Sequence, residues 1–292
     1  MKILGVIVTY NPKIERLNKN ISAVIGQVDE LLIVDNNSVN IKEIRNICEE
    51  GKIGIHEFDC NMGIAFALSN GLEYGRKNNY DYIFTLDQDS ICSNGMIEKL
   101  TEGFFEFKEV AICSPEIFEI HLIDEKQHNF RRSEVIIIDR CQTSGSLCSV
   151  QKLIEVGGFN DELFIDEVDH ELCYRLERAG YLILKNKDTY LLHEIGEPVK
   201  RKFLFKEIVV SNHDISRLYY IGRNLRYIIR EFGDLEQVRE RNIQLELIKR
   251  MLKIIFYEKN KGKKIKTIIE GIIDGKNFTT KMSRRDKKLI GE

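Results

Sequence analysis

Short apolar runs alternate with amphipathic segments over the first 87 residues, and this alternation constrains the fold more than any other feature. Four runs have the length and β-branched composition of buried strands: residues 3–10, 31–35, 53–58 and 82–86. Three segments between them space their apolar residues as amphipathic helices do: 14–25, 41–48 and 63–76. Strands that alternate with helices through short links predict an α/β fold whose sheet is mainly parallel.

The pattern becomes more mixed after about residue 110. Further strands are expected at 110–120, 134–138, 181–184 and 189–192, with a helix over 168–179. From residue 211 to the end, the sequence is mostly helical and rich in charge. We therefore expect an α/β domain over residues 1–205, followed by a helical, basic region over 206–292.

Polar side chains follow each of the first four expected strands. They are Thr9-Tyr10-Asn11-Pro12, Asp35-Asn36-Asn37-Ser38, Asn61-Met62-Gly63 and Asp87-Gln88-Asp89-Ser90. Each group alone is typical of turns and helix caps. Because the carboxyl ends of parallel strands meet at one edge of the sheet, where ligands bind, the four groups together indicate a binding site.

Asp87 and Asp89 suggest a metal site at this edge. Two carboxylates separated by one residue at a strand end can approach one divalent cation, and oxygen ligands favour Mg²⁺ or Mn²⁺. Such an ion would stabilise a diphosphate as a leaving group. His193 follows an apolar strand and is a candidate third ligand, although a single histidine in such a place is more often structural.

A second acidic cluster lies between Asp161 and Asp169, where five carboxylates are interleaved with apolar residues. Acidic groups suit the N-terminal end of a helix, which accounts for some of them. The interleaved apolar residues indicate that the segment is partly buried. A buried carboxylate beside a substrate is a candidate general base.

In order along the chain, these motifs resemble those of the family 2 inverting glycosyltransferases with the GT-A fold, in their rhamnosyltransferase-like branch. The resemblance covers residues 1–227. The matching segments are 6–12, 33–38, 61–65, 86–90, 157–159, 165–175, 193–197 and 219–224. In this family the half of the catalytic domain near residues 1–110 would bind the nucleotide, and residues 111–205 would bind the acceptor.

The resemblance also implies roles for individual residues. Nucleotide binding is expected at Thr9, Tyr10, Asn11, Asp35, Asn61, Gly63 and Asp87. The metal, Mn²⁺ or Mg²⁺, is expected at Asp87, Asp89 and His193. Asp169, six residues before Arg175, matches the catalytic base. The commoner pattern has an acidic residue directly before the base, whereas this chain has Val168 there, so Asp166 is kept as an alternative.

The expected activity is transfer of a sugar from a nucleotide diphosphate to a hydroxyl of a polysaccharide or lipid-linked acceptor, with inversion. Rhamnose from dTDP-rhamnose is the expected donor sugar, and galactofuranose, an N-acetylhexosamine or a non-catalytic sugar-nucleotide-binding relative are the alternatives. A nucleotidyltransferase would carry a Gly-rich, Arg-containing loop after the first strand, and a dinucleotide-dependent oxidoreductase would carry GxGxxG. Thr9-Tyr10-Asn11-Pro12 stands there instead.

Charge and apolar content indicate where the protein works. No apolar stretch reaches the ~18 residues of a membrane span, so we expect a cytoplasmic protein. The seven cysteines show no CxxC pair and are expected to be reduced thiols. Residues 249–292 hold 14 Lys and Arg against five Asp and Glu. This basic region either contacts the inner face of an anionic membrane or packs on the catalytic domain, and no nucleic-acid partner is expected.

Overall fold

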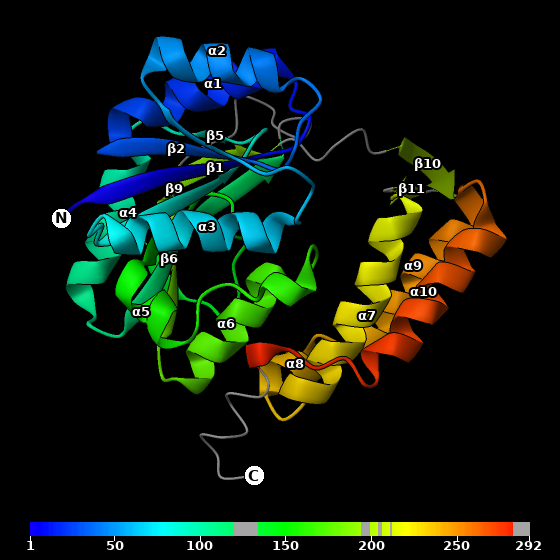
Figure 1. The fold of residues 1–292 in the computed structure, drawn as a ribbon. Coiled ribbons are helices and arrows are strands. Elements are labelled where there is room, and N and C mark those ends of the chain that lie inside the picture. The colour runs from blue at the N-terminus through cyan, green and yellow to red at the C-terminus, as the bar shows by residue number, and fades with distance from the viewer. Residues whose placement is uncertain (120–133, 194–198, 204–205, 211, 283–292) are drawn as a thin grey trace. The chain divides into compact units, whose positions relative to one another are not determined.

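The computed structural model describes residues 1–119, 134–193, 199–203, 206–210 and 212–282 (Figure 1). Two compact units divide the chain. The first consists of residues 1–161 and 172–194, and the second of residues 162–171 and 195–292. A segment from the middle of the sequence, 162–171, therefore belongs to the C-terminal unit.

The first unit contains the predicted parallel sheet. Its first four strands are β1 (Ile3–Thr9), β2 (Glu30–Asp35), β3 (Gly54–Glu57) and β4 (Tyr82–Asp87). They are parallel and lie in the order β3-β2-β1-β4. The predicted alternation is thus confirmed, and the four strand ends lie side by side at one edge of the sheet.

The sheet continues with strands of mixed direction. They are β8 (Ser146–Ser149), β6 (Val110–Glu119), β9 (Leu182–His193) and β5 (Ile91–Cys92), with β7 (Val135–Ile137) pairing β9. β8 is antiparallel to both β4 and β6, whereas β9 is parallel to β6. Ile120, the last residue of one expected strand, lies outside the described residues.

One expected break in the sheet is wrong. Residues 181–184 and 189–192 were expected as two strands, because polar residues separate them, but 182–193 form the single strand β9. The register of β9 against β6 shifts where Pro115 pairs Asn186 and Glu116 pairs Tyr190. The polar residues between Asn186 and Tyr190 form a bulge rather than a turn, so the strand continues to His193.

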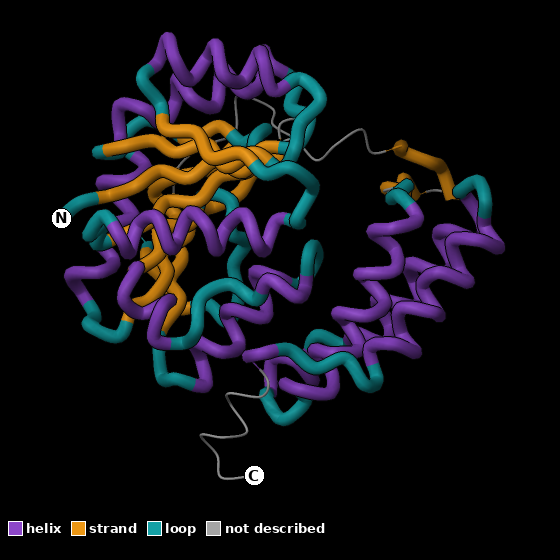
Figure 2. The backbone as a smooth tube through the Cα atoms, viewed as in Figure 1, coloured by secondary structure: helices purple, strands orange, loops and turns teal. Residues whose placement is uncertain are grey.

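Helices cover both faces of this sheet (Figure 2). They are α1 (Ile14–Val24), α2 (Ile41–Gly51), α3 (Ile64–Lys77), α4 (Met96–Glu106) and α5 (Val150–Glu155). Alternate residues of β1 face opposite layers: Ile3 and Ile7 join a core with residues of α1, α2 and α4, while Val6 lies against Gly71 of α3. Burial on both faces explains why the strands are apolar throughout.

The second unit is mostly helical, as expected. After the hairpin of β10 (Val199–Phe203) and β11 (Lys206–Val210) come α7 (Ile215–Phe232), α8 (Glu236–Glu240), α9 (Ile243–Tyr257) and α10 (Lys261–Gly275). A Cβ atom at Gly222 of α7 would overlap the Ile268 carbonyl, and one at Gly271 would overlap that of Tyr219. Glycine therefore lets α7 and α10 pack backbone against backbone.

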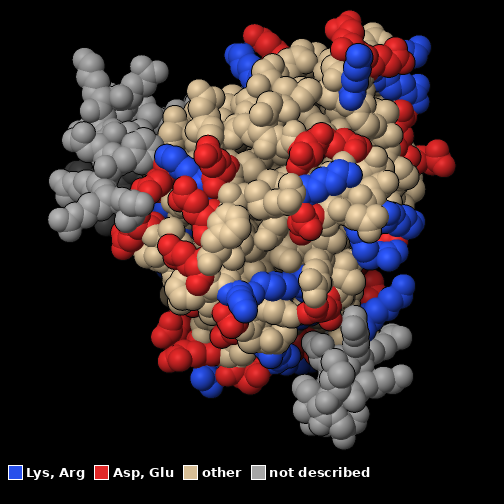
Figure 3. All heavy atoms as spheres, turned by 90° about the vertical axis from the view of Figure 1, so that its left-hand side faces the viewer, with Lys and Arg blue, Asp and Glu red and all other residues tan. Residues whose placement is uncertain are grey.

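The thiols agree with the sequence, and one face of the surface shows how charge is distributed. On the face in Figure 3, basic and acidic side chains are interspersed, and neither sign forms a continuous patch over the described residues drawn there. All seven cysteines are free thiols, and five are buried. Within the described part of the chain, no helix has the length and apolar content needed to cross a membrane.

Candidate active site

Hydrogen bonds link the loops that follow β1 to β4 into a continuous strand-end rim. The Tyr10 main chain pairs with the Gln88 side chain, its N–H donating to Oε1 at 2.8 Å and its carbonyl accepting from Nε2 at 3.3 Å. The Asn36 amide donates to the Gly63 carbonyl at 3.1 Å and accepts from the Met62 N–H. These contacts hold four separate loops in one arrangement, at the edge where the sequence predicted a binding site.

Thr9 and Asp35 form the buried base of this rim. Both are 0% exposed, and the Thr9 hydroxyl donates to Asp35 Oδ2 at 2.7 Å. Ser38 donates to the same carboxylate through its N–H at 2.8 Å and its hydroxyl at 2.6 Å. Asp35 thus holds the ends of β1 and β2 together. Tyr10, Asn11 and Asn61 are exposed on the same rim, whereas Gly63 is buried.

Asp87, Asp89 and His193 lie together, as the sequence predicted. One ligand atom from each lies within 4.8 Å of the other two, and His193 Nδ1 is 3.8 Å from Asp89 Oδ1. Asp87 ends β4 and His193 ends β9, so the sheet brings these distant residues to one place. Two carboxylates and an imidazole form a donor set that suits Mn²⁺ or Mg²⁺.

Two buried serines support this triad and were missed from the sequence. Ser90 Oγ lies 3.2 Å from His193 Nδ1 and 2.8 Å from Ser144 Oγ. Ser144 in turn accepts the Asp87 N–H at 3.0 Å. Ser90 stands beside the predicted pair of aspartates, but nothing in the sequence around Ser144 marks it. The serines orient the histidine and the strand end, as outer ligand-supporting residues do in metal sites.

Two residues of α1 also fix this loop. Asn20 Nδ2 donates to the Asp87 carbonyl at 2.6 Å, and Arg16 Nε donates to the Asp89 carbonyl at 2.7 Å. Asn20 is a fully buried amide on a helix whose other buried residues are apolar. A polar residue at an apolar position of the helical pattern is the signal that could have identified it.

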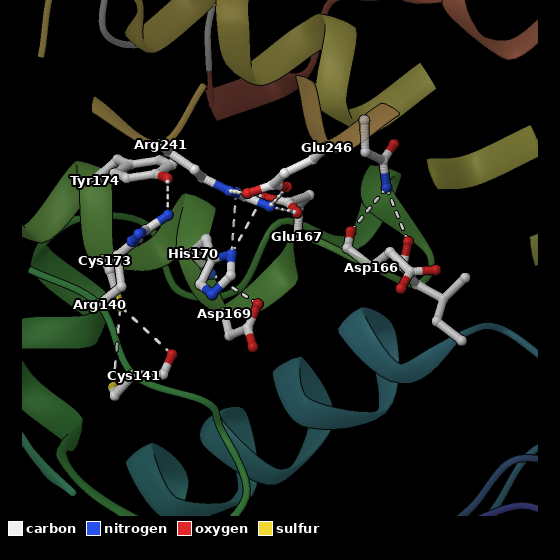
Figure 4. Close-up of polar contacts among 12 residues, drawn as sticks. Arg140, Cys141, Asp166, Glu167, Asp169, His170, Cys173, Tyr174, Arg241 and Glu246 are labelled. Atoms are coloured by element: carbon white, nitrogen blue, oxygen red, sulfur yellow. Dashed lines mark hydrogen bonds and ion pairs between the residues drawn. The ribbon is translucent and has the colours of Figure 1, made fainter. Parts of the chain in front are cut away.

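Residues 162–169, called the acidic loop below, lie in the second unit. Arginines neutralise two of the carboxylates of this loop. Arg217 forms a two-pronged ion pair with Asp166, at 2.9 Å from Nη2 and 3.0 Å from Nε. Arg241 contacts Glu167 at 2.5 and 2.7 Å, and both of these side chains are buried. Figure 4 shows Arg241 reaching Glu167 and His170, with Asp169 on the other side of the histidine.

Asp169 has a different environment. It lies at the start of α6 (Val168–Arg178) and is partly buried. Its Oδ1 accepts a hydrogen bond from the main-chain N–H of His170 at 2.8 Å. No lysine or arginine in the described part of the chain forms an ion pair with it. Burial raises the pKa of Asp169, and the nearby positive charge of His170 opposes this. Asp169 is therefore the carboxylate of this loop best suited to accept a proton near neutral pH.

The charge of His170 depends on the same cluster. Burial lowers its pKa, but the charge of Asp169 and the contact with Glu167 outweigh burial and raise the pKa to about 9. Burial raises the pKa of Glu167, but Arg241 and His170 lower it to about 2. The stabilisation from His170 is present below pH 6.5 and lost as pH rises through about 9, whereas that from Glu167 is lost as pH falls through about 2.

The backbone of the acidic loop is strained and is held by one amide. Phe164, Asp166 and Glu167 have φ of 66°, 64° and 63°, in the left-handed region that costs a non-glycine residue about 1–2 kcal/mol. The fully buried Asn224 of α7 directs Nδ2 at the carbonyls of Leu163, Ile165 and Asp166, at 3.0, 2.8 and 2.9 Å. Neither the strain nor this clamp was evident from the sequence, although Asn224 lies in a motif that supported the resemblance.

We predict that Asn224→Asp disorders the acidic loop, because a carboxylate would face three carbonyl oxygens that now accept hydrogen bonds. Hydrogen exchange over residues 163–167 should rise and transfer should fall by at least about tenfold, since each buried carbonyl left without a partner costs about 1–3 kcal/mol. Donor binding should persist, because the rim lies in the other unit.

Asn78→Asp is the matched control, since Asn78 is exposed and its amide donates to a single carbonyl. Unchanged exchange over 163–167 in Asn224→Asp would contradict the role of Asn224 as the clamp.

Comparisons with known proteins show which sequences and folds this chain resembles. Residues 6–144 match the sequence model of Glycosyl transferase family 2. The dTDP-rhamnosyl transferase RfbF of Shigella flexneri is 29% identical over 290 residues, 94% of this chain and 95% of the relative. S. aureus TarS (residues 1–349) has a TM-score of 0.57 at 13% identity, covering 94% of this chain and 81% of that one.

A further solved structure, GalNAc-T7 with UDP, GalNAc and Mn²⁺, has a TM-score of 0.55 at 15% identity. It matches 66% of this chain, which spans only 44% of GalNAc-T7. At these identities, the solved structures establish the fold alone. The sheet order and the sequence matches agree: residues 6–144 form a family 2 glycosyltransferase domain, and the chain has the GT-A fold.

Proposed function

We propose that this glycosyltransferase moves rhamnose from dTDP-rhamnose to a hydroxyl of a polysaccharide or lipid-linked acceptor, with inversion and with the help of a divalent cation. The donor is inferred from the Shigella flexneri relative, a dTDP-rhamnosyl transferase that aligns along nearly the whole chain. The observation that carries the mechanism is the state of Asp169, which is partly buried beside carboxylates that arginines already neutralise.

The strand-end rim is the proposed donor site. Tyr10, Asn11 and Asn61 are exposed there and would contact the nucleotide directly. Thr9 and Asp35 are buried and bonded to each other, so their predicted nucleotide contacts remain a prediction, as do those of Gly63 and Asp87. The metal would be held by Asp87, Asp89 and His193, whose donor atoms already lie close together.

The proposed chemistry is a single displacement. Asp169 takes the proton of the acceptor hydroxyl as that oxygen bonds to the anomeric carbon of the sugar. The bond from this carbon to the diphosphate oxygen breaks on the opposite side, and its electron pair leaves with the nucleoside diphosphate. The cation, when bound, supplies positive charge that stabilises the diphosphate. Displacement from one side inverts the anomeric centre and requires no covalent enzyme intermediate.

The second unit offers a surface for the membrane contact considered from the sequence. On α9 the exposed apolar side chains are Leu245, Ile248, Leu252, Ile255 and Phe256. Their helical spacing places them on one face, beside the exposed Lys249 and Lys253. A basic, amphipathic helix of this kind can lie in the interface of an anionic membrane, and co-sedimentation with anionic vesicles tests this contact.

For the metal, we predict that Asp89→Asn loses both cation-dependent donor binding and turnover, because one anionic ligand is removed from the triad. Calorimetric titration of dTDP-rhamnose with and without Mn²⁺ measures the first, and product formation the second. Glu50→Gln removes an exposed carboxylate near the C-terminal end of α2, outside the rim, and should change neither. Full activity of the unmutated protein in excess chelator would exclude metal dependence.

For the base, we predict that Asp169→Asn binds donor and cation normally but loses turnover by roughly 10²–10⁴-fold, the usual contribution of general-base catalysis. The amide keeps the shape of the carboxylate but cannot take up the proton. Asp166→Asn should lose much less, because Arg217 already occupies that carboxylate. An inactive Asp166→Asn beside an active Asp169→Asn would assign the base to Asp166 instead.

For pH dependence, we predict that transfer falls on the acidic side as Asp169 becomes protonated, at a pH above the ordinary range for aspartate. His170→Gln should move this limb to higher pH, because the positive charge of His170 lowers the pKa of Asp169. The measurement is kcat/KM against pH, with His56→Gln, an exposed histidine, as the control. If His170→Gln does not shift the acid limb, Asp169 is not the group whose protonation causes it.

A further inference from the structure

A basic pocket of about 280 Å³ lies in the second unit, between α9 and the start of α7. Its charged or titratable lining consists of His213, Glu246, Lys249, Arg250, Lys253 and Glu258. The proposed transfer reaction uses none of these residues. The volume is just below the range for drug-sized ligands, so the pocket suits a small polar group.

The two carboxylates of the lining are already neutralised. Glu246 Oε2 is 3.0 Å from Nη2 of Arg241, and Glu258 Oε2 is 2.6 Å from Nζ of the buried Lys264. Neither Arg241 nor Lys264 lines the pocket. Lys249 and Arg250 therefore add positive charge that these two carboxylates do not neutralise inside the pocket.

Arg250 is a partly buried positive charge in the lining of this pocket. It is half-buried, and within the described residues its guanidinium makes no hydrogen bond. Burial lowers its pKa, and the positive charge of Arg217 lowers it further, against the opposing charge of Asp166. A partly buried guanidinium of this kind can gain charge-assisted hydrogen bonds from a bound anion.

The pKa of His213 reflects the positive charges of the arginines around it. Burial lowers its pKa to about 4, and the charges of Arg217 and Arg250 contribute to this. The imidazole is therefore neutral at pH 7 and retains one N–H donor. Within the described residues, His213 makes no hydrogen bond. The pocket thus offers the guanidinium of Arg250, the ammonium group of Lys249 and an imidazole N–H.

We propose that this pocket binds a phosphoryl or diphosphoryl group. Its donors match phosphate oxygens, which accept several charge-assisted hydrogen bonds at once, and a guanidinium can bind two of these oxygens together. The pocket belongs to the second unit, whereas the rim that would bind the donor belongs to the first.

A lipid is the favoured source of the phosphate. Lys249 and Lys253, which line the pocket, border the exposed apolar face of α9 that includes Ile248, Leu252 and Phe256. A lipid whose chains meet this face would present its phosphate at the level of the lysines. Dissolved diphosphate has the same chemistry, and the experiment separates the two sources.

The test is histidine NMR on the full chain, with inorganic diphosphate as the probe and the signal of His213 assigned from His213→Gln. Diphosphate should raise the pKa of His213 from about 4, because it adds negative charge beside the ring. Arg250→Gln should weaken diphosphate binding at this signal by about tenfold or more, the scale of one hydrogen bond to a charged group. Because Arg250 is half-buried, Lys249→Gln provides a second variant at an exposed position.

Lys263→Gln is the matched control, since Lys263 is exposed on α10 and lies outside the pocket lining. In a second arm, phosphatidylcholine vesicles contain either phosphatidic acid or phosphatidylglycerol at matched surface charge. Preference for phosphatidic acid, lost in Arg250→Gln, supports a lipid phosphate. A response to diphosphate alone supports a dissolved one. A His213 pKa that neither probe changes would overturn the proposal, whatever the transferase activity.

Discussion

The acidic loop depends on one interaction, the contact of the Asn224 amide with the carbonyls of Leu163, Ile165 and Asp166. Without it, the left-handed backbone at Phe164, Asp166 and Glu167 would relax, since non-glycine residues are strained there. The neighbouring Arg223 adds contacts from Nη2 to the carbonyls of Glu162 and Leu163, at 2.7 and 3.0 Å. A buried amide on a rigid helix therefore sets the conformation of the segment that leads into Asp169.

The carboxylates of the acidic loop differ in how their negative charge is compensated. A buried carboxylate is unfavourable unless a cation and hydrogen bonds compensate it. Arg217 and Arg241 supply this compensation to Asp166 and Glu167, which become structural. Asp169 forms no ion pair with an arginine or lysine of the described residues, so burial and the opposing charges of His170 and Glu167 act on its pKa. Neighbouring acidic residues in one short segment thus have different electrostatic environments because they have different partners.

Hydrophobic periodicity was sufficient to predict β1 to β4 and α1 to α3, because each of these elements is one continuous segment of the sequence, whereas β5, β8, α4 and α5 were not predicted. Each strand from β1 to β4 is a continuous apolar run, and a parallel sheet places their ends together without further information. The Asp87, Asp89 and His193 set was therefore predictable from strand ends. The polar stretch within 182–193 was wrongly predicted as a break between two strands, because a bulge and a turn have similar composition.

The contacts that define the acidic loop could not be predicted in this way. Asn224, Arg217 and Arg241 lie far along the chain from the residues they hold, and no local pattern encodes such pairs. Ser144 was missed for the same reason. Sequence patterns identify the residues that carry chemistry, whereas the residues that position them depend on tertiary packing.

The central claim is a single displacement in which Asp169 acts as the base and no enzyme nucleophile takes part. The most direct measurement is the anomeric configuration of the first product, read by proton NMR during transfer from dTDP-rhamnose to an acceptor. The account predicts a linkage of configuration opposite to that of the donor. A product that retains the donor configuration would require two displacements or a different route, and would contradict the mechanism.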